Sequence, residues 1–258
     1  MSIKKLFDLS GRVAIVTGGS RGLGLQMAEA LGEMGAKVAI TARKAKELSE
    51  ASAQLQQKGI EVLVHACDLS DPAAAQPLVD AVMAQWGRID ILVNNAGTTW
   101  GAPMEEHPLE AWQKVINLNL TAMFVLTQAV GKAAMIPRRS GKIINIASIA
   151  GLSGTEPEFM PTIAYNTSKA GVINFTKSVA CEWGKYNIHV NAIAPGVFPS
   201  KMSHGMIDRS EKYILDHTPL RRMGTDADLK GVTVLLASDA SDFMTGTVIP
   251  VDGGFAAM

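Results

Sequence analysis

A regular alternation of short β-branched runs with longer helical patterns is the strongest constraint on the fold of this chain. Runs such as Lys37–Thr41 and Val62–Ala66 are short and mostly apolar, and a helical pattern follows each of them. Strands that are apolar on both faces and separated by helices pair in parallel, because the crossover helices cover both faces of the sheet. The alternation therefore predicts an α/β fold, a single doubly wound domain over residues 1–258 with about seven parallel strands.

The expected elements follow the chain in strict order. The strands are 12–17, 37–41, 62–66, 89–94, 142–147, 189–194 and 247–251. The helices are 24–34, 45–57, 73–86, 109–134, a helix that carries Tyr165 and ends near Trp183, and 226–237. The polar stretch 198–220 breaks the alternation. We expect it to form a mobile lid over the substrate, with an ordinary surface insertion as the alternative.

The charge balance narrows the classes of partner. Lysine plus arginine equals aspartate plus glutamate, at 24 each, so no global field attracts nucleic acid or an anionic membrane. The first ten residues hold no apolar run long enough for a signal peptide, and no stretch of about 20 apolar residues was found. We expect a cytoplasmic protein that binds a small molecule, and neither nucleic acid nor membrane.

Cysteine and histidine usage argues against a metal site. Cys67 follows a strand-like run and Cys181 lies in an apolar helical stretch, so both are expected to be buried rather than to form a disulfide or a nucleophile. The five histidines show no ligand spacing with cysteines or carboxylates. No metal ion is expected.

A glycine-rich loop, Thr17–Gly24, follows the first strand and opens into a helix. Its spacing is Gly-x-x-x-Gly-x-Gly, without the Gly-Lys-Ser/Thr ending of a nucleoside triphosphate loop. Glycines permit a tight turn, and the free amides of a helix N-terminus attract a pyrophosphate. A purely structural turn is the alternative. The expected cofactor residues here are Gly18, Ser20, Arg21, Gly22, Leu23 and Gly24.

The end of the second strand bears on the choice of cofactor. An NAD-binding chain typically places Asp or Glu there to accept hydrogen bonds from the ribose, and Ala39–Lys44 contains neither. Arg43 and Arg21 offer guanidinium groups that can fork onto a 2′-phosphate, so NADP(H) is predicted over NAD(H). The alternative is that Arg43 and Lys44 only solvate the start of a helix.

Two later strand ends complete the expected cofactor site. Asp68, which precedes Leu69, can accept from an adenine amino group or cap the next helix. The fourth strand ends in Asn94, Asn95, Ala96 and Gly97. Small residues there let the backbone run against a cofactor, and the asparagine amides can tie neighbouring strands together.

Tyr165 and Lys169 stand four residues apart in an expected helix, so their side chains leave the same face. A phenol with an ordinary pKa near ~10 exchanges protons poorly at neutral pH, and a neighbouring ammonium lowers that pKa. The pair can therefore act as an acid–base catalyst in hydride chemistry at a carbonyl. A solvated helix face is the alternative when the spacing is taken alone.

Together these features resemble the short-chain dehydrogenase/reductase family, whose fold is of the Rossmann type, over nearly the whole chain. The glycine loop, the Asn-Asn-Ala-Gly element and the Tyr-x-x-x-Lys pair match the family's motifs. The matching catalytic positions are Asn119, Ser148, Tyr165 and Lys169. The turn that lies along the nicotinamide matches Pro195, Gly196, Val197 and Ser200, the last where the family usually has threonine.

The resemblance implies roles for these residues. Tyr165 would give its proton to the carbonyl oxygen, which Ser148 would hold by a hydrogen bond. Lys169 would bind the ribose and lower the pKa of Tyr165, while Asn119 would hold a water that relays protons. Seventeen positions separate Ser148 from Tyr165, a few more than is usual, so Gly151–Pro161 is expected to form an enlarged loop over the substrate.

The substrate is less constrained than the chemistry. A mostly apolar pocket is expected from Thr98, Trp100, Ser153, Phe159, Met160, Phe198 and Met202. It favours a ketone such as a 3-oxoacyl thioester or an alicyclic ketone. A sugar-acid or polyol dehydrogenase, or a catalytically silent nucleotide-binding protein, is the alternative. The C-terminal stretch 244–254 resembles the family's oligomer-forming end, so a homotetramer or homodimer is expected.

Overall fold

A computed structural model describes residues 2–156 and 158–258 of the chain. Seven parallel strands form one sheet in the order β3-β2-β1-β4-β5-β6-β7, which confirms the predicted fold. The direction of winding reverses between β1 and β4, and such a switch point opens a crevice beyond the carboxyl ends of the strands. The strands are β1 (Val13–Thr17), β2 (Lys37–Ala42), β3 (Val62–Ala66), β4 (Ile91–Asn94), β5 (Gly141–Ile146), β6 (Ile188–Pro195) and β7 (Val248–Val251).

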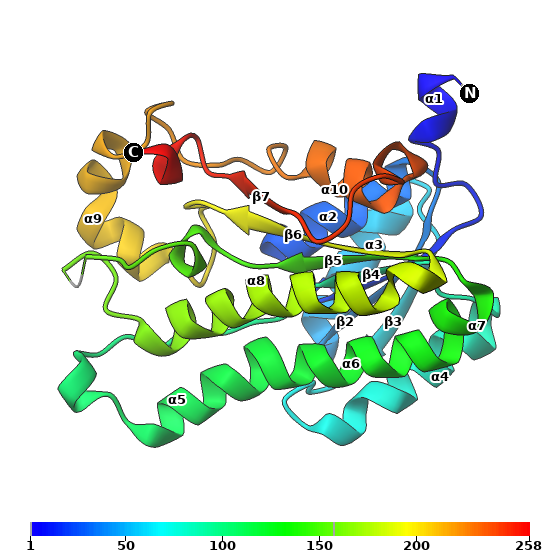
Figure 1. Cartoon of the computed structure of the whole chain (residues 1–258), viewed down its shortest axis with the longest axis horizontal. Helices are drawn as coiled ribbons and strands as arrows, with labels where there is room; N and C mark the ends of the chain where they lie inside the picture. Colours follow the sequence, from blue (N-terminus) through cyan, green and yellow to red (C-terminus); the bar gives the residue numbers. More distant parts are fainter. Residues whose placement is uncertain (1, 157) are drawn as a thin grey trace.

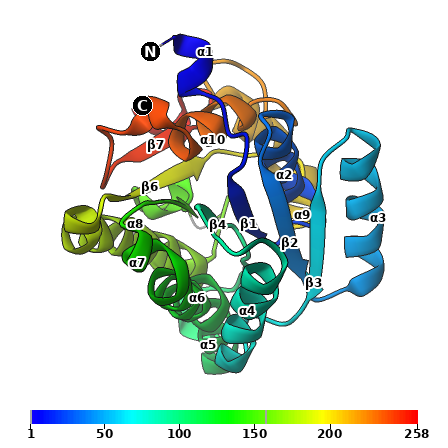
Figure 2. The same ribbon diagram turned by 90° about the vertical axis from the view of Figure 1, so that its right-hand side faces the viewer.

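Two layers of helices cover the sheet. Figures 1 and 2 show α2, α3 and α10 on one face, and α4 to α8 on the other. Two π-helical turns, 117–121 and 131–135, join α5, α6 and α7 into one long helical run. The helices are α1 (Ile3–Leu6), α2 (Gly22–Glu33), α3 (Ala45–Gln57), α4 (Ala75–Trp86), α5 (Leu109–Ile116), α6 (Ala122–Val130), α7 (Ile136–Arg138), α8 (Ile163–Trp183), α9 (His204–Asp216) and α10 (Lys230–Ala237).

Strand β1 shows how the sheet divides the core. All of its residues are buried, and successive side chains point to opposite faces. Ala14 and Val16 join the apolar cluster beneath α2 and α3, whereas Val13 and Ile15 join the cluster beneath α4 and α6. A strand that is apolar throughout needs a helical layer on each side, which is why the alternation in the sequence identified the architecture.

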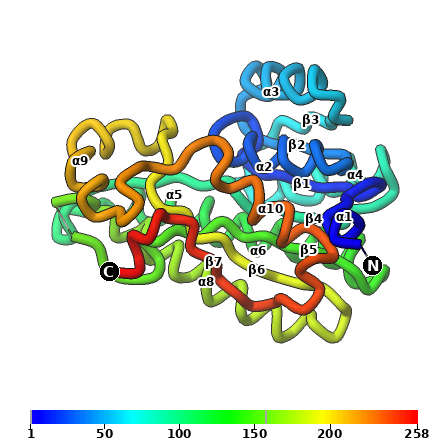
Figure 3. The backbone as a smooth tube through the Cα atoms, turned by 90° about the horizontal axis from the view of Figure 1, so that it is seen from above, coloured from blue at the N-terminus to red at the C-terminus, as the bar shows by residue number. Residues whose placement is uncertain are grey.

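The segment 198–220 contains helix α9. Figure 3 shows α9 beyond the carboxyl ends of the strands, at the same end of the molecule as the C-terminus. Ile214 on this helix is fully buried, so α9 packs against the body of the protein. The backbone is non-helical at Ser210, where φ is −133°. The sequence predicted a lid in this segment, and its movement stays a prediction.

The expected burial of the cysteines was wrong for Cys181. This side chain is exposed, and Cys67 is half-buried. The inner face of α8 carries polar residues such as Ser168 and Thr176, both fully buried. An apolar stretch of sequence therefore did not mark the inner face of this helix.

The helical run Leu109–Arg138 is long and apolar enough to cross a membrane, by length and composition alone. It passes by its mean hydropathy and is interrupted by polar residues, so it is not the stretch of about 20 apolar residues that the sequence was searched for. In the structure this run packs beside α4 and α8 in one helical layer (Figure 2). Its most apolar window is 44% buried inside the protein.

Candidate active site

A cavity of about 760 Å³ lies at the carboxyl edge of the sheet. This volume falls within the usual range for a small-molecule or cofactor site. Every residue that the sequence predicted for the cofactor lines it, from the glycine loop to the turn after β6. Ser148, Phe159, Met160 and Met202 also line it.

The glycine loop is shaped for close approach of a ligand. Gly18 has a φ of +64°, and a Cβ on it would lie 2.9 Å from the Asn95 amide nitrogen. A Cβ on Gly24 would lie 2.2 Å from the carbonyl oxygen of Gly18, so neither position can accept a side chain. Helix α2 begins without a side-chain cap, so the amides of its first turn face the cavity edge. This cradle fits a pyrophosphate.

The side chain of Asn95 holds the backbone of the glycine loop in place by hydrogen bonding. Its amide nitrogen donates to the carbonyl oxygen of Thr17 at 2.8 Å, and Asn94 donates to Asn145 on β5 at 2.9 Å. The asparagines therefore tie neighbouring strands together, as the sequence indicated. Asp68 accepts from the backbone and the hydroxyl of Ser70, at 3.0 and 2.7 Å, within a turn, and the short helix Pro72–Ala74 that follows is capped by Asp71 instead.

Tyr165 and Lys169 leave the same face of α8 within the site, where Lys169 is buried and Tyr165 is half-buried. Burial raises the pKa of Tyr165, and a hydrogen bond with Ser148 partly opposes that rise. Burial lowers the pKa of Lys169 to about 8. The Lys169 ammonium donates to the carbonyl oxygen of Ile146 at 2.7 Å and lies 5.5 Å from the centre of the Tyr165 ring.

The expected lowering of the Tyr165 pKa by Lys169 is wrong for this structure. Desolvation of the phenol dominates, and the lysine makes its hydrogen bond to the backbone of β5 instead. The phenol is therefore protonated at neutral pH, and its raised pKa makes it a weaker acid than the pair predicted from the sequence.

Asn119 lies in the π-helical turn between α5 and α6 rather than in the main cavity. Its carboxamide accepts from the backbone N–H of Thr98 at 2.8 Å and donates to the carbonyl of Thr98 and to Ser168, both at 2.9 Å. It thereby holds the chain that follows β4. Asn119 and Lys169 also line a separate small hollow of about 10 Å³.

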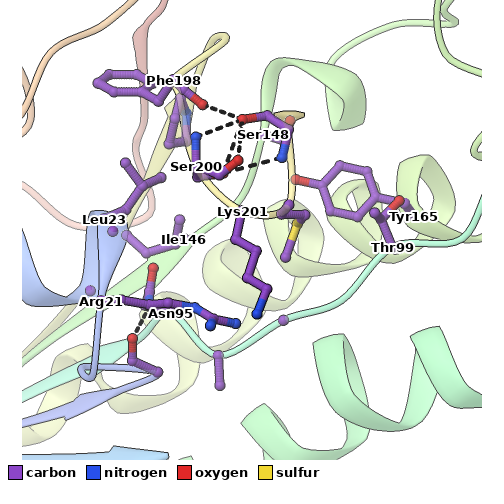
Figure 4. A pocket seen from close by; sticks show the side chains of 18 of the residues that line it. Arg21, Leu23, Asn95, Thr99, Ile146, Ser148, Tyr165, Phe198, Ser200 and Lys201 are labelled. Carbon is purple, nitrogen blue, oxygen red and sulfur yellow. Dashed lines mark hydrogen bonds between the residues drawn. The ribbon is translucent and has the colours of Figure 1, made fainter. Parts of the chain in front are cut away.

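Figure 4 shows Ser148, Tyr165 and Ser200 grouped at one end of the cavity, with Arg21 and Asn95 at the other. Ser200 is held by Ser203, whose hydroxyl donates to the carbonyl of Phe198 at 2.6 Å. The Phe198 ring packs in the core against Gly224. Phe198 therefore borders the cavity but keeps its ring in the core.

Several predicted substrate contacts lie elsewhere. Trp100 is 45% exposed, and neither it nor Thr98 lines the cavity; Thr99 does so instead. The backbone of Thr98 is held by Asn119, which turns this segment. Ser153 is exposed and also lies outside the cavity.

Other cavity residues were not predicted at all. Glu47 in the first turn of α3, and Lys201, Met206 and Arg209 in the segment around α9, all line the cavity. They belong to no motif, and only the closeness of Lys201 to Ser200 in sequence could have pointed to one of them. Within residues 2–156 and 158–258, no group of three or more His, Cys, Asp or Glu side chains could hold a metal ion.

A dinucleotide-sized cavity with a pyrophosphate cradle and a Tyr–Lys–Ser group in its wall, on a doubly wound sheet, defines a nicotinamide-nucleotide-dependent oxidoreductase. A family model described as enoyl-(acyl carrier protein) reductase matches residues 18–256. The chain belongs to the short-chain dehydrogenase/reductase family, which acts on CH–OH groups with NAD(P).

Similar proteins act on different substrates. Gluconate 5-dehydrogenase of Gluconobacter oxydans is 38% identical over 98% of both chains. The rhamnolipids biosynthesis 3-oxoacyl-(acyl-carrier-protein) reductase of Pseudomonas aeruginosa is 39% identical over 96% of this chain and 98% of the relative. The structure of a gluconate 5-dehydrogenase from Burkholderia cenocepacia, in complex with NADP and tartrate, is 32% identical over 100% of both chains, with a TM-score of 0.93.

Proposed function

We propose that this protein interconverts a ketone and a secondary alcohol with NADP(H). The observation that carries the proposal is the group of Tyr165, Ser148 and Lys169 at one end of a cavity whose other end is a pyrophosphate cradle. The nicotinamide supplies or accepts a hydride when it is bound. The residues of the chain then have to orient the carbonyl and move one proton.

Tyr165 is the proposed proton donor to the carbonyl oxygen in the direction of reduction. With its raised pKa, Tyr165 holds the proton on its phenol oxygen at neutral pH. The hydroxyl of Ser148 is hydrogen-bonded to that oxygen and so lies beside it. Ser148 is therefore the proposed second donor to the same carbonyl oxygen. In alcohol oxidation Tyr165 would act as the phenolate, after its proton has left, and take up the proton of the alcohol.

Lys169 and Asn119 form the proposed proton path. Both residues line the hollow of about 10 Å³, which has room for about one water molecule. A water there would connect the ammonium of Lys169 to the carboxamide of Asn119, and so resupply the phenol. The contact of Asn119 with Thr98 is also a structural role, so this residue serves both functions in the proposal.

The preference for NADP(H) rests on cations at the adenosine end of the cavity. Arg21, Arg43 and Lys44 all line it, and the end of β2 holds no carboxylate that could accept from a ribose hydroxyl. Guanidinium groups suit a phosphate because they donate two parallel hydrogen bonds. The similar gluconate 5-dehydrogenase from Burkholderia cenocepacia was solved with NADP.

The favoured substrates are 3-oxoacyl thioesters and alicyclic ketones, because Phe159, Met160 and Met202 make the cavity wall near Tyr165 largely apolar. A sugar acid is the second candidate. It is supported by Arg209, a cation of α9 that lines the cavity and could hold a carboxylate.

A screen of NADPH oxidation over 3-oxoacyl thioesters, alicyclic ketones and keto-sugar acids tests the proposal. We expect one ketone class to be reduced with NADPH at a higher kcat/KM than with NADH. A higher kcat/KM with NADH contradicts the coenzyme preference. NADPH binding without turnover of any class would instead favour a catalytically silent nucleotide-binding protein.

A further inference from the structure

One carboxylate stands among the cations of the cofactor cavity. The guanidinium of Arg21 lies 3.1 Å from both carboxylate oxygens of Glu47, and the ammonium of Lys44 lies 3.0 Å from one of them. The three residues come from the glycine loop, the end of the β2–α3 connection and the first turn of α3, and all line the cavity.

Glu47 carries its negative charge at neutral pH. The hydrogen bond from Lys44 lowers its pKa most; burial opposes this, and the charges of Arg21 and Lys201 lower it further. Figure 4 shows the Lys201 side chain extending from the lid segment in the direction of Arg21. Glu47 is thus surrounded by cations from three parts of the chain, and its own side chain is 27% exposed.

These ion pairs occupy the donors that a 2′-phosphate would need. A guanidinium that faces Glu47 with one nitrogen has to give up or share that contact before it can fork onto a phosphate. The carboxylate and a phosphate on the same cations also repel each other. Neither effect acts on a ribose that carries only hydroxyl groups.

We propose that Glu47 is a coenzyme-specificity residue that competes with the 2′-phosphate of NADP(H) for Arg21 and Lys44. This inference rests on the proposed use of these cations for the 2′-phosphate. Glu47 thereby lowers the affinity of the protein for NADP(H). It makes the affinities for NADP(H) and NAD(H) more similar than they would be without this carboxylate. Its position in the first turn of α3 gives it a second effect, a favourable interaction with the helix dipole, which does not distinguish the two coenzymes.

Dissociation constants for NADPH and NADH, measured by titration without substrate, test the proposal in Glu47→Gln. We expect NADPH to bind about three- to fivefold tighter, the size of an exposed ion-pair effect, with NADH binding no tighter. The gain should shrink in high salt, because the competing charges are partly exposed. Glu50→Gln is the matched control, since it removes the same charge from the same helix at an exposed position. In this variant the ratio of the dissociation constants for NADPH and NADH should equal that of the wild type.

Two further measurements separate the possible failures. In an Arg21→Gln background, Glu47→Gln should have a smaller effect, because only the competition for Lys44 is left. A purely structural Glu47 would change the melting temperature and leave the NADPH to NADH ratio unaltered, which overturns the proposal, as does weaker NADPH binding. A wild type that binds NADH more tightly than NADPH contradicts the proposed coenzyme preference. The change in the NADPH dissociation constant caused by Glu47→Gln still decides the role of Glu47 in that case.

Discussion

At the scale of single residues, the proposed chemistry depends on one phenol, that of Tyr165, which is protonated at neutral pH. Tyr165→Phe removes the proton donor and leaves the ring in place, so we expect turnover to fall by about 10²–10⁴-fold, the usual contribution of a general acid. The dissociation constant for NADPH should change little, because the phenol oxygen is at the far end of the cavity from the glycine loop (Figure 4). Steady-state kinetics and NADPH titration measure the two effects, and near-normal turnover would refute the role.

Lys169 gives the reaction a pH dependence near neutrality. Its pKa is lowered by burial from 10.5 to about 8, so its ammonium is present below pH 8 and is lost above it. We expect kcat/KM for ketone reduction to be level at lower pH and to fall above pH 8, since the proton supply to Tyr165 then declines. Lys169→Arg keeps its charge across this range, so its weaker activity should lack that fall. An identical fall in the variant would assign the titration to another group.

At the scale of secondary-structure elements, Glu29 joins α2 to α10. Its carboxylate pairs with Lys230 on α10 and lies 2.8 Å from the ammonium of Lys58. Burial alone would raise the pKa of Glu29, but the hydrogen bonds from the two lysines lower it from 4.5 to about 2. The lowered pKa means that the pair stabilises the fold above pH 4.5 and that this stability is lost as the pH falls toward 2.

Glu29→Gln should therefore lower the free energy of unfolding by about 2 kcal/mol at neutral pH, the value typical of a hydrogen bond to a charged group. The difference from wild type should shrink as the pH falls from 4.5 toward 2. Urea unfolding of both proteins at several pH values measures this difference in the free energy of unfolding. Glu33→Gln is the control, because Glu33 meets the same Lys230 from a side chain that is 44% exposed and should contribute less. Equal losses for the two variants would contradict the assigned role of burial.

The elements also show which parts of the site a sequence can predict. The glycine loop and the Tyr165–Lys169 pair are local patterns, since a few neighbouring residues on one element set their geometry. The exposure of Trp100 and the contact of Glu47 with Arg21 depend on segments that are distant in the chain, so no spacing could reveal them. The pKa of Tyr165 was misjudged for the same reason, because its burial depends on the whole site closing around it.

At the scale of the whole molecule, the parallel sheet explains why residues from so many parts of the chain meet in one cavity. Parallel strands place all their carboxyl ends at one edge, so the loops after β1, β2, β4, β5 and β6 converge there. The helical layers stabilise the sheet from both faces and leave this edge free. Changes of substrate can therefore be made in the loops and in α9 without altering the core, which accords with relatives that share the fold and act on different substrates.

The assembly of the whole molecule is the remaining prediction, and Phe243, fully exposed just before β7, provides its test. An apolar ring in this position, beside the stretch 244–254 that resembles an oligomer-forming end, is expected to be covered by a second copy of the chain. Phe243→Ser should then lower the mass measured by light scattering toward that of one chain, 27.4 kDa. Met104→Ser, which removes an apolar side chain that is 67% exposed elsewhere, should leave the mass unchanged. A wild-type mass of one chain would rule out the dimer and the tetramer, and an unchanged mass in Phe243→Ser would place the contact on another face.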